Sequence, residues 1–383
     1  MRIERVVLRH IRVPLKVKFR TAETERTVSE NMVVEVVLED GTSGFGEGVP
    51  REYVTGETVT TCFTFLRPVA GSLRGLGCAG FAEAVELAGE LTFGDDPLHP
   101  QCAARAALEI ALLDAAGRRF GVPLFKLIEF LPDLASLSGP REEVRYGGVV
   151  SAGAGVLSAW KYRLYGFRDV KLKLGIDPEG DVAFVTRMRR RLGKHVDVRV
   201  DANGGWSSKE AVRVMRKLKS LGVSFVEQPL ADADRMQLAG LRSKTSVPVM
   251  LDESLVSERD AQLAVDGKLC DAFNLRISKN GGLIPTLKLA KLAADASLGV
   301  QLGCHPGETG ILSAAGRALA SSVTGFLYLE GSCDRHLLKR NVIEEDVTFG
   351  RGGLASRLRG PGLGVTVRPR DLDALTTEVL EIG

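Results

Sequence analysis

One repeated pattern constrains the fold of this chain more than any other feature of its sequence. From about residue 144 onward, a short apolar run is followed by a polar residue and then by a segment with amphipathic helical spacing. Near-continuous runs of Val, Ile and Leu are typical of parallel strands buried on both faces. Eight such units predict a closed (β/α)8 barrel. The runs are Val144–Val150, Asp169–Leu174, Val196–Val200, Val223–Val226, Val247–Leu251, Asp271–Leu275, Val300–Leu302 and Gly325–Leu329.

Capping signals mark where several helices of these units begin. Asp177 precedes Pro178, which suits the first helical position because proline has no backbone N–H to leave unpaired. Ser207-Ser208-Lys209-Glu210 has the spacing of a capping box, and Ser257-Glu258-Arg259-Asp260 resembles one with a shorter acid.

The residues before the repeats predict a separate α+β domain. Pro14 is expected to end its first strand, Asp40-Gly41 to form a turn, and Pro100–Phe120 to be a helix. The Gly- and Arg-rich end of the chain is expected to pack back on this domain. The predicted strands are Glu4–Val13, Met32–Leu38 and Ser43–Glu47. The expected parts are the α+β domain at 1–135, the barrel at 136–333 and the returning tail at 334–383.

Composition excludes several classes of protein. The apolar runs are too short to span a membrane, and the first residues lack the apolar stretch of a secretory signal. The six cysteines are scattered without a CxxC pair, which is typical of reduced thiols in the cytoplasm. The 51 Lys and Arg against 48 Asp and Glu form no long basic block, so we expect no nucleic-acid partner.

A charged or titratable residue stands at or near the end of most of the predicted strands. Catalytic residues of such barrels collect there, contributed by several strands at once. From the second strand onward these residues recur every 24 to 29 positions. They are Lys171 and Lys173, Asp201, Glu227, Asp252, Arg276, His305 and Glu330.

The three acids predict a metal site. Asp201, Glu227 and Asp252 end three consecutive strands, so their carboxylates converge and repel one another unless a cation neutralises them. Carboxylate oxygens favour Mg²⁺, with Mn²⁺ as a possible substitute. For a single acid, helix capping or an ion pair with an Arg would be the more common role.

Lys171 and Lys173 are two positions apart on one strand, so both side chains are expected to point into the barrel mouth. Adjacent ammonium groups and burial lower a lysine pKa, which would let Lys173 exchange a proton near neutral pH. Two solvated lysines at a surface edge are the alternative.

Five segments in this order resemble the enolase superfamily, and within it the muconate-lactonizing-enzyme-like subgroup of the mandelate racemase/muconate lactonizing enzyme family. The resemblance implies a capping domain over a (β/α)7β barrel, Mg²⁺ held by Asp201, Glu227 and Asp252, and Lys173 as acid/base supported by Lys171. It also implies removal of a proton α to a carboxylate through a metal-stabilised enediolate. The segments are Val170–Gly175, Val200–Trp206, Val226–Pro229, Leu251–Ser254 and Ser278–Gly282; Gly44–Gly48 and Ala104–Gly117 also match.

Two residues depart from the subgroup. Arg276 occupies the place of a second catalytic Lys; Arg stays protonated and is a poor base, although it can hold an enolate or a carboxylate. Lys279, three residues further on, is expected to point away from Arg276 because of its odd offset along a strand. Mandelate-racemase-like relatives use a His at the place of His305, with an Asp partner where this chain has Arg276. Two roles are therefore open for His305. It could act as a base, or it could lie at the rim of the barrel and form a hydrogen bond with the substrate or with loop backbone.

Substrate contacts are expected from loops of the capping domain and from the barrel mouth. The candidates in these loops are Arg20, Arg51 and Tyr53, which could bind a second carboxylate or a polar tail of the substrate. For any one of them, keeping a loop soluble or pairing with the other domain at the interface is the more common role. Asn203 and Glu330 are the candidates in the barrel, and a salt bridge to a Lys is an equal alternative for Glu330.

The leading hypothesis is a Mg²⁺-dependent isomerase or lyase acting on a small carboxylate, of the cycloisomerase or syn-elimination type, because these reactions need one base on one face. The alternative is a racemase or epimerase of amino-acid or dipeptide derivatives, which needs a group such as His305 on the opposite face. A non-catalytic metal-dependent carboxylate binder is the third reading, and the two retained lysines speak against it. We also expect a homo-oligomer.

Overall fold

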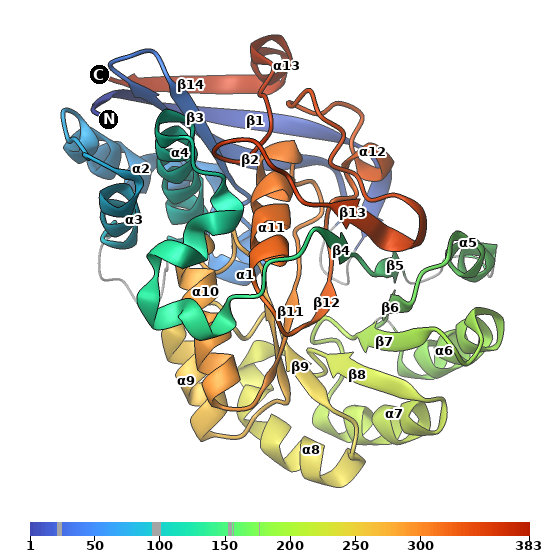
Figure 1. Ribbon diagram of the computed structural model, residues 1–383. Helices are drawn as coiled ribbons and strands as arrows, with labels where there is room; N and C mark the ends of the chain where they lie inside the picture. Colours follow the sequence, from blue (N-terminus) through green and yellow to red (C-terminus); the bar gives the residue numbers. More distant parts are fainter. Residues whose placement is uncertain (21–24, 94–100, 152–154, 156, 176) are drawn as a thin grey trace.

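The computed structural model describes residues 1–20, 25–93, 101–151, 155, 157–175 and 177–383. Its centre is a curled sheet of eight parallel strands in the order β12-β11-β10-β9-β8-β7-β6-β5 (Figure 1). The backbone N–H of Gly147, just before β5, donates to the carbonyl of Leu329 in β12 at 2.8 Å and links the two ends of the sheet. The strands are β5 (Gly148–Val150), β6 (Asp169–Lys173), β7 (Asp197–Asp201), β8 (Val223–Glu227), β9 (Val249–Leu251), β10 (Ala272–Leu275), β11 (Gly299–Leu302) and β12 (Phe326–Leu329).

Seven of the eight predicted strands agree with the structure to within two residues. The first prediction was wrong in part, because Val144–Val150 is two strands. β4 (Glu143–Arg145) pairs antiparallel with β13 (Leu354–Ser356) outside the barrel, and only β5 joins the parallel sheet. Gly147 and Gly148 separate the two strands, and a Cβ on Gly147 would lie 2.1 Å from the Asp169 carboxylate.

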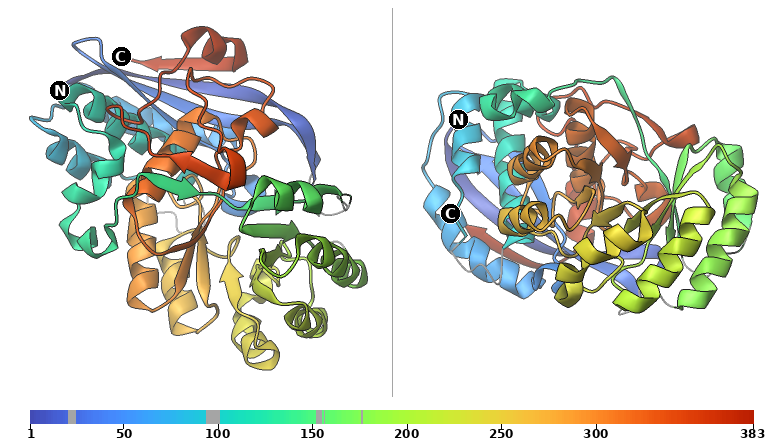
Figure 2. Two further views of the ribbon diagram at one scale, coloured as in Figure 1. Left: turned by 45° about the vertical axis from the view of Figure 1, so that its right-hand side comes forward. Right: turned by 90° about the horizontal axis from the view of Figure 1, so that it is seen from below.

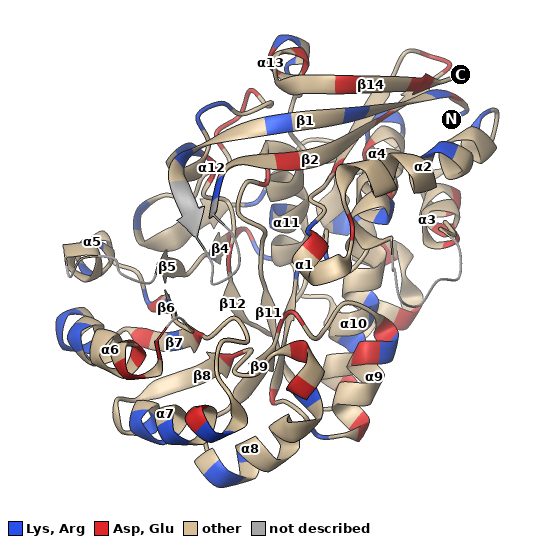
Figure 3. Cartoon of the chain, turned by 180° about the vertical axis from the view of Figure 1, so that it is seen from behind, with Lys and Arg blue, Asp and Glu red and all other residues tan. Residues whose placement is uncertain are grey.

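Helices surround the sheet and connect its strands (Figure 2). The predicted starts are confirmed: the Asp177 carboxylate accepts from the N–H groups of Glu179 and Gly180, and Ser207 and Ser257 each form a capping box. The connecting helices are α5 (Leu157–Tyr165), α6 (Pro178–Leu192), α7 (Ser208–Ser220), η3 (Asp232–Gln237), α8 (Leu238–Thr245), α9 (Glu258–Asp266), α10 (Leu283–Asp295) and α11 (Gly310–Ser322). Residues of both charge signs are distributed along these outer helices (Figure 3).

An antiparallel sheet in the order β14-β1-β2-β3 forms the core of the second domain and lies along one side of the barrel (Figures 1 and 2). The strand β14 (Thr376–Ile382) pairs with β1, so both chain ends belong to this sheet, as the fold class predicted. Its other strands are β1 (Ile3–Arg20), β2 (Glu25–Leu38) and β3 (Ser43–Gly48). Its helices are α1 (Glu52–Thr55), α2 (Val59–Leu73), α3 (Phe81–Gly89), α4 (Cys102–Phe120), η1 (Leu124–Phe130) and η2 (Pro132–Leu137); α12 (Asp334–Leu337), η4 (Arg351–Gly353) and α13 (Pro369–Leu375) belong to the tail.

Pro14 does not end the first strand, contrary to prediction. β1 runs on to Arg20 and pairs with β2 from Ile3 to Pro14 and again at Phe19 and Arg20, with a register irregularity between Pro14 and Phe19. The pairing with β14 stops at Ile11, and around Pro14 the second edge of β1 meets the tail instead: Leu15 forms an isolated antiparallel bridge with Leu338, and the Pro14 carbonyl accepts from the Lys339 N–H at 2.9 Å. Proline is tolerated at such an edge because its missing N–H breaks no ladder bond.

Three glycines of β3 allow helix α4 to lie directly on the strand. A Cβ on Gly44, Gly46 or Gly48 would each lie 2.0 Å from a backbone atom of α4. No side chain fits at these positions, so the Ala-rich face of α4 packs backbone to backbone against the sheet. Among the residues that the structure describes, no helix is long and apolar enough to cross a membrane.

Buried acids join the two domains. The Glu109 carboxylate of α4 accepts from the N–H groups of Leu283 and Ile284, the first residues of α10 in the barrel. Free N–H groups at a helix start favour an anionic acceptor. Burial nevertheless outweighs these bonds and raises the pKa of Glu109 to about 7.

Candidate active site

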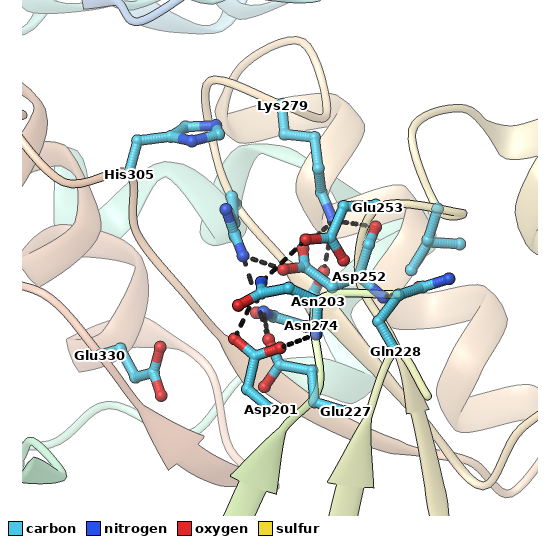
Figure 4. A network of polar contacts seen from close by, with 12 residues as sticks. Asp201, Asn203, Glu227, Gln228, Asp252, Glu253, Asn274, Lys279, His305 and Glu330 are labelled. Atoms are coloured by element: carbon cyan, nitrogen blue, oxygen red, sulfur yellow. Dashed lines mark hydrogen bonds and ion pairs between the residues drawn. The ribbon is translucent and has the colours of Figure 1, made fainter. Parts of the chain in front are cut away.

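The three acids predicted as metal ligands are brought together at one end of the parallel sheet. Asp201 ends β7, Glu227 ends β8, and Asp252 follows β9. Their exposed fractions are 0%, 1% and 0%. Figure 4 shows their side chains pointing toward one another from neighbouring strands. The parallel pairing places Asp201 beside Glu227 and explains this convergence.

Both lysines of β6 point into this group of acids, as their spacing predicts. Lys173 Nζ lies 3.3 Å from Asp201 Oδ2, and Lys171 Nζ lies 3.1 Å from both oxygens of Glu227. Burial would raise the pKa of Asp201, but Lys173 and Lys171 outweigh burial and lower it.

The expected lowering of the Lys171 pKa is wrong. Burial disfavours its ammonium group, yet Glu227, Glu330 and Asp201 outweigh burial and raise the pKa of Lys171 above its ordinary value. Glu330 lies 2.8 Å from Lys171 and 2.8 Å from Arg199, and these two cations overcome burial to lower its pKa to about 2. Lys171 is therefore ion-paired with Glu227 and Glu330, and Glu330 has the salt-bridge role.

Two further cations hold Asp252. The Arg276 guanidinium donates to Asp252 Oδ2 and lies 3.9 Å from Glu227 Oε1. Lys279 Nζ donates to Asp252 Oδ1 at 2.8 Å and to the Asn274 carbonyl at 2.8 Å.

The prediction that Lys279 points away is wrong. β10 ends at Leu275, so the two-residue alternation of a strand does not reach residue 279. A turn follows, in which the Asn280 side chain accepts from the Arg276 N–H and donates to the carbonyls of Leu255 and Val256. This turn directs Lys279 back onto Asp252.

Sequence analysis missed several polar residues that surround the acids. Asn274 in β10 and Gln301 in β11 donate to Glu227 at 2.8 and 3.3 Å. Gln228 accepts from the N–H groups of Asp252 and Ser254. The alternation within β10 and β11 is the signal that could have placed Asn274 and Gln301 inside the barrel.

Asn203 supports the acids rather than standing apart from them. Its side chain donates to Asp201 at 3.3 Å and to Glu253 at 3.1 Å, and its backbone N–H donates to Asp201 at 3.0 Å. Asn203 and Gln228 have positive φ angles of 44° and 36°, which cost conformational energy and cluster at functional sites.

The acids suit Mg²⁺ in donor type. Glu253 adds a fourth carboxylate beside them; burial, followed by repulsion from Asp201, raises its pKa to about 7. Its Oε2 is buried, and no residue that the structure describes donates a hydrogen bond to it. Within the described ranges, no three acidic, His or Cys side chains stand at metal-ligand spacing. The Arg276 guanidinium contacts Asp252 and is near Glu227, so an ion shared by the three acids requires this side chain to release Asp252.

His305 follows β11 and lies above the acids (Figure 4). Its side chain is buried, and its Nδ1 has no hydrogen-bond partner in the described part of the chain. Burial, followed by the charges of Arg276 and Arg51, lowers the pKa of His305 well below its ordinary value. Burial and these charges therefore favour the neutral imidazole.

The predicted residues of the capping domain have different surroundings. Arg51 is buried and donates to Ser29 Oγ and to the carbonyls of Pro50, Glu30 and Pro306. Its guanidinium is therefore hydrogen-bonded within the protein, whereas the sequence predicted a contact with substrate. Tyr53, in α1, lies under the Arg26 guanidinium, which is 5.4 Å from the ring centroid. The Arg20 side chain lies outside the described residues.

Comparisons with known proteins agree with this arrangement. Residues 2–129 match the model of the mandelate racemase/muconate lactonizing enzyme N-terminal domain, and residues 156–372 match the enolase C-terminal domain-like model. The chain is 30% identical to an L-Ala-D/L-Glu epimerase of Clostridium acetobutylicum over 86% of this chain and 90% of the relative.

Solved structures are similar over the whole chain. The N-succinyl Arg/Lys racemase of Bacillus cereus superimposes with a TM-score of 0.87 at 26% identity, covering 100% of both chains. A dipeptide epimerase of Cytophaga hutchinsonii, solved with Mg and the dipeptide D-Ala-L-Val, has a TM-score of 0.86 at 25% identity and also covers 100% of both chains.

Proposed function

Because the chain belongs to the mandelate racemase/muconate lactonizing enzyme family of the enolase superfamily, we propose that it is a racemase or epimerase of an amino-acid or dipeptide derivative. Enzymes of this family that are similar to the chain are isomerases or lyases, and the chain is an enzyme of that kind. The relatives favour the epimerase alternative over the cycloisomerase or syn-elimination hypothesis that led the sequence analysis.

One observation carries the proposal: proton-transfer candidates lie on both sides of the buried acids. Lys173 ends β6, and His305 follows β11, beyond the opposite strand β10 in the eight-stranded order. An epimerase must remove the α-proton on one face of the substrate carbon and return it on the other. The neutral imidazole of His305 can accept a proton on its unprotonated ring nitrogen, and the imidazolium so formed can return it to the same face in the reverse direction.

Asp201, Glu227 and Asp252 are the side chains that would hold Mg²⁺, and Mn²⁺ would suit the same oxygens. When bound, the ion supplies positive charge that stabilises negative charge developing on the substrate carboxylate. The Lys171 ammonium group pairs with Glu227 and Glu330 and adds positive charge at the base of the site. Arg276, once released from Asp252, can donate two hydrogen bonds to a substrate oxygen.

A second candidate function rests on Arg276. A guanidinium at this position cannot act as a base, so Lys173 alone would serve a one-face reaction such as cycloisomerisation or syn-elimination. This candidate requires no proton transfer by His305.

Deuterium exchange distinguishes these functions. Dipeptides, N-succinyl amino acids and unsaturated dicarboxylates are incubated with the enzyme and Mg²⁺ in heavy water, and label and optical rotation are followed together. An epimerase incorporates deuterium at Cα and changes the rotation, and His305→Asn retains exchange on one face only. Exchange without inversion in the parent protein supports the one-face reaction, and no exchange with any substrate contradicts both functions.

A further inference from the structure

The loop that carries His305 is held by the capping domain. It follows β11 and ends at Thr309, the N-cap of α11. Four polar residues of the capping domain contact it, and their exposed fractions are between 0% and 3%. We call these four residues the clasp. They are Ser29, Asn31, Glu47 and Arg51.

Arg51 contacts the residue directly after His305. Its Nη2 donates to the Pro306 carbonyl at 3.0 Å and to Ser29 Oγ at 2.7 Å, and its Nη1 donates to the Pro50 carbonyl at 2.8 Å. The guanidinium thus bridges β2, the start of the α1 segment and the loop. A planar group with several fixed donors holds such an arrangement more rigidly than an ammonium group can.

Asn31 and Glu47 hold the rest of the loop. Asn31 Nδ2 donates to the Gly307 carbonyl at 2.8 Å and to Glu47 Oε1 at 2.6 Å. Glu47 accepts from the Thr309 N–H and hydroxyl, and from the N–H of Leu312 in α11. The loop is therefore bound at three residues within four positions of His305.

Gly307 lets the loop approach β2 closely. Its φ angle is +95°, which favours glycine, and a Cβ there would lie 2.3 Å from the Ser29 Cβ. Loop and strand are in direct contact at this point, with no room for a side chain between them.

We propose that the clasp positions the His305 imidazole over the barrel mouth, with Arg51 as a positioning residue. The inference rests on the proposed function, in which His305 transfers a proton. The ring Nδ1 has no hydrogen-bond partner among the described residues, so no bond at this nitrogen fixes the ring, and the position of its backbone matters more. That backbone is held on one side by the Glu308 carboxylate, which accepts from the His305 N–H at 2.5 Å, and on the other by the clasp.

Arg51 also acts on His305 through its charge. The cations that lower the His305 pKa come from three elements packed around it: Arg276 and Lys279 after β10, Arg51 after β3, and Arg26 in β2. Replacing Arg51 by an uncharged residue is therefore expected to raise the His305 pKa, which gives a signal that loss of packing alone does not give.

The test uses the full-length enzyme with Arg51→Met, Arg51→Lys and Ser29→Ala, with Arg119→Met as a control. Arg119 is a half-exposed arginine of the same domain, in α4, and pairs with Asp40 rather than with a residue of the clasp. Two quantities are measured: the pKa of His305 by NMR of the ring nitrogens, assigned with His305→Asn, and α-deuterium exchange on each face of the substrate. Ser29→Ala removes one hydroxyl only and keeps the test valid if Arg51→Met does not fold.

In Arg51→Met we expect a higher His305 pKa and a fall of about a hundredfold in exchange on the His305 face, the size of effect that a displacement of about 1 Å can have. Exchange on the Lys173 face is expected to change much less. Arg51→Lys should restore the pKa but only part of the rate, and Ser29→Ala should lower the rate without changing the pKa.

Equal loss on both faces with an unchanged His305 pKa in Arg51→Met would overturn the positioning role, as would parental behaviour of both Arg51→Met and Ser29→Ala. If the parent exchanges on the Lys173 face only, the proposed epimerase function fails. The NMR measurement then still tests whether the clasp sets the state of His305.

Discussion

The two sides of the site are built differently. On the β6–β9 side, Lys171, Lys173, Asp201 and Glu227 are strand residues, and hydrogen bonds between parallel neighbours fix their positions. On the β10–β11 side, Arg276 and His305 stand beyond the strand ends, and a turn and the capping domain hold them. Chemistry common to a family can reside on the rigid side, while the side held by loops can vary between members.

The largest expected effect concerns the strand side. Lys173→Ala should reduce α-proton exchange by about 10⁴-fold, the upper range for one general acid–base group, and should leave the fold intact. Mass spectrometry of the substrate in heavy water measures it, and Lys209→Ala on the exposed face of α7 is the control. Exchange at the parental rate would show that Lys173 is not the base. The base would then be sought on the β10–β11 side, with His305 as the first candidate.

Arg276 tests the loop side. Arg276→Met should slow turnover by about 10²–10³-fold, as for the loss of a preorganised donor. The same change removes a cation that competes for Asp252, so Mg²⁺ should bind about tenfold more tightly by calorimetry. Arg276→Lys should open a second exchange route, because Lys can lose its proton where Arg cannot. Weaker Mg²⁺ binding by Arg276→Met would show that the guanidinium does not compete with the ion.

Asp252 lies where the two sides meet. Asp252→Asn should weaken Mg²⁺ binding by about tenfold or more, since a buried carboxylate ligand is lost. It should also free Arg276 and Lys279, which both donate to this carboxylate. Isothermal calorimetry is the measurement, with Asp232→Asn in the exposed η3 as the control. Unchanged affinity would exclude Asp252 as a ligand.

The smallest effect concerns the joint between the capping domain and the β10–β11 side. The pKa of Glu109 is about 7 in the folded protein, above its ordinary 4.5. The unfolded chain therefore loses its proton at a lower pH than the folded protein does. The free energy of unfolding therefore falls as pH rises between the two pKa values of Glu109, 4.5 and about 7. Above pH 7 the whole destabilisation from burying the ionised Glu109 carboxylate is present.

Thermal unfolding should consequently become easier from pH 5 to pH 8, and in Glu109→Gln this decline should be smaller by about 1–2 kcal/mol. Glu86→Gln on the exposed face of α3 should retain the parental slope. Equal slopes in Glu109→Gln and the parent would assign the pH dependence to other groups.

The same contrast explains what the sequence could predict. Seven barrel strands were found from their apolar runs, and the positions of Lys171, Lys173, Asp201 and Glu227 followed from strand alternation and order. Lys279 was misplaced because a turn, which Asn280 stabilises, replaces the alternation of the strand. The buried role of Arg51 could not be predicted, because all its acceptors except the Pro50 carbonyl are distant in the sequence: Ser29 and Glu30 lie more than 20 residues before it, and Pro306 lies 255 residues after it.

The pairing of β14 with β1 also orders events during synthesis. β1 leaves the ribosome before β2, and β2 can pair with it at once along one edge. Its other edge between Val6 and Ile11 has no strand partner until residues 376–382 have been made. Throughout synthesis of the barrel, the nascent chain therefore presents an open strand edge, the kind of surface that promotes aggregation and chaperone binding. We therefore expect this sheet to be completed only after residues 376–382 are available.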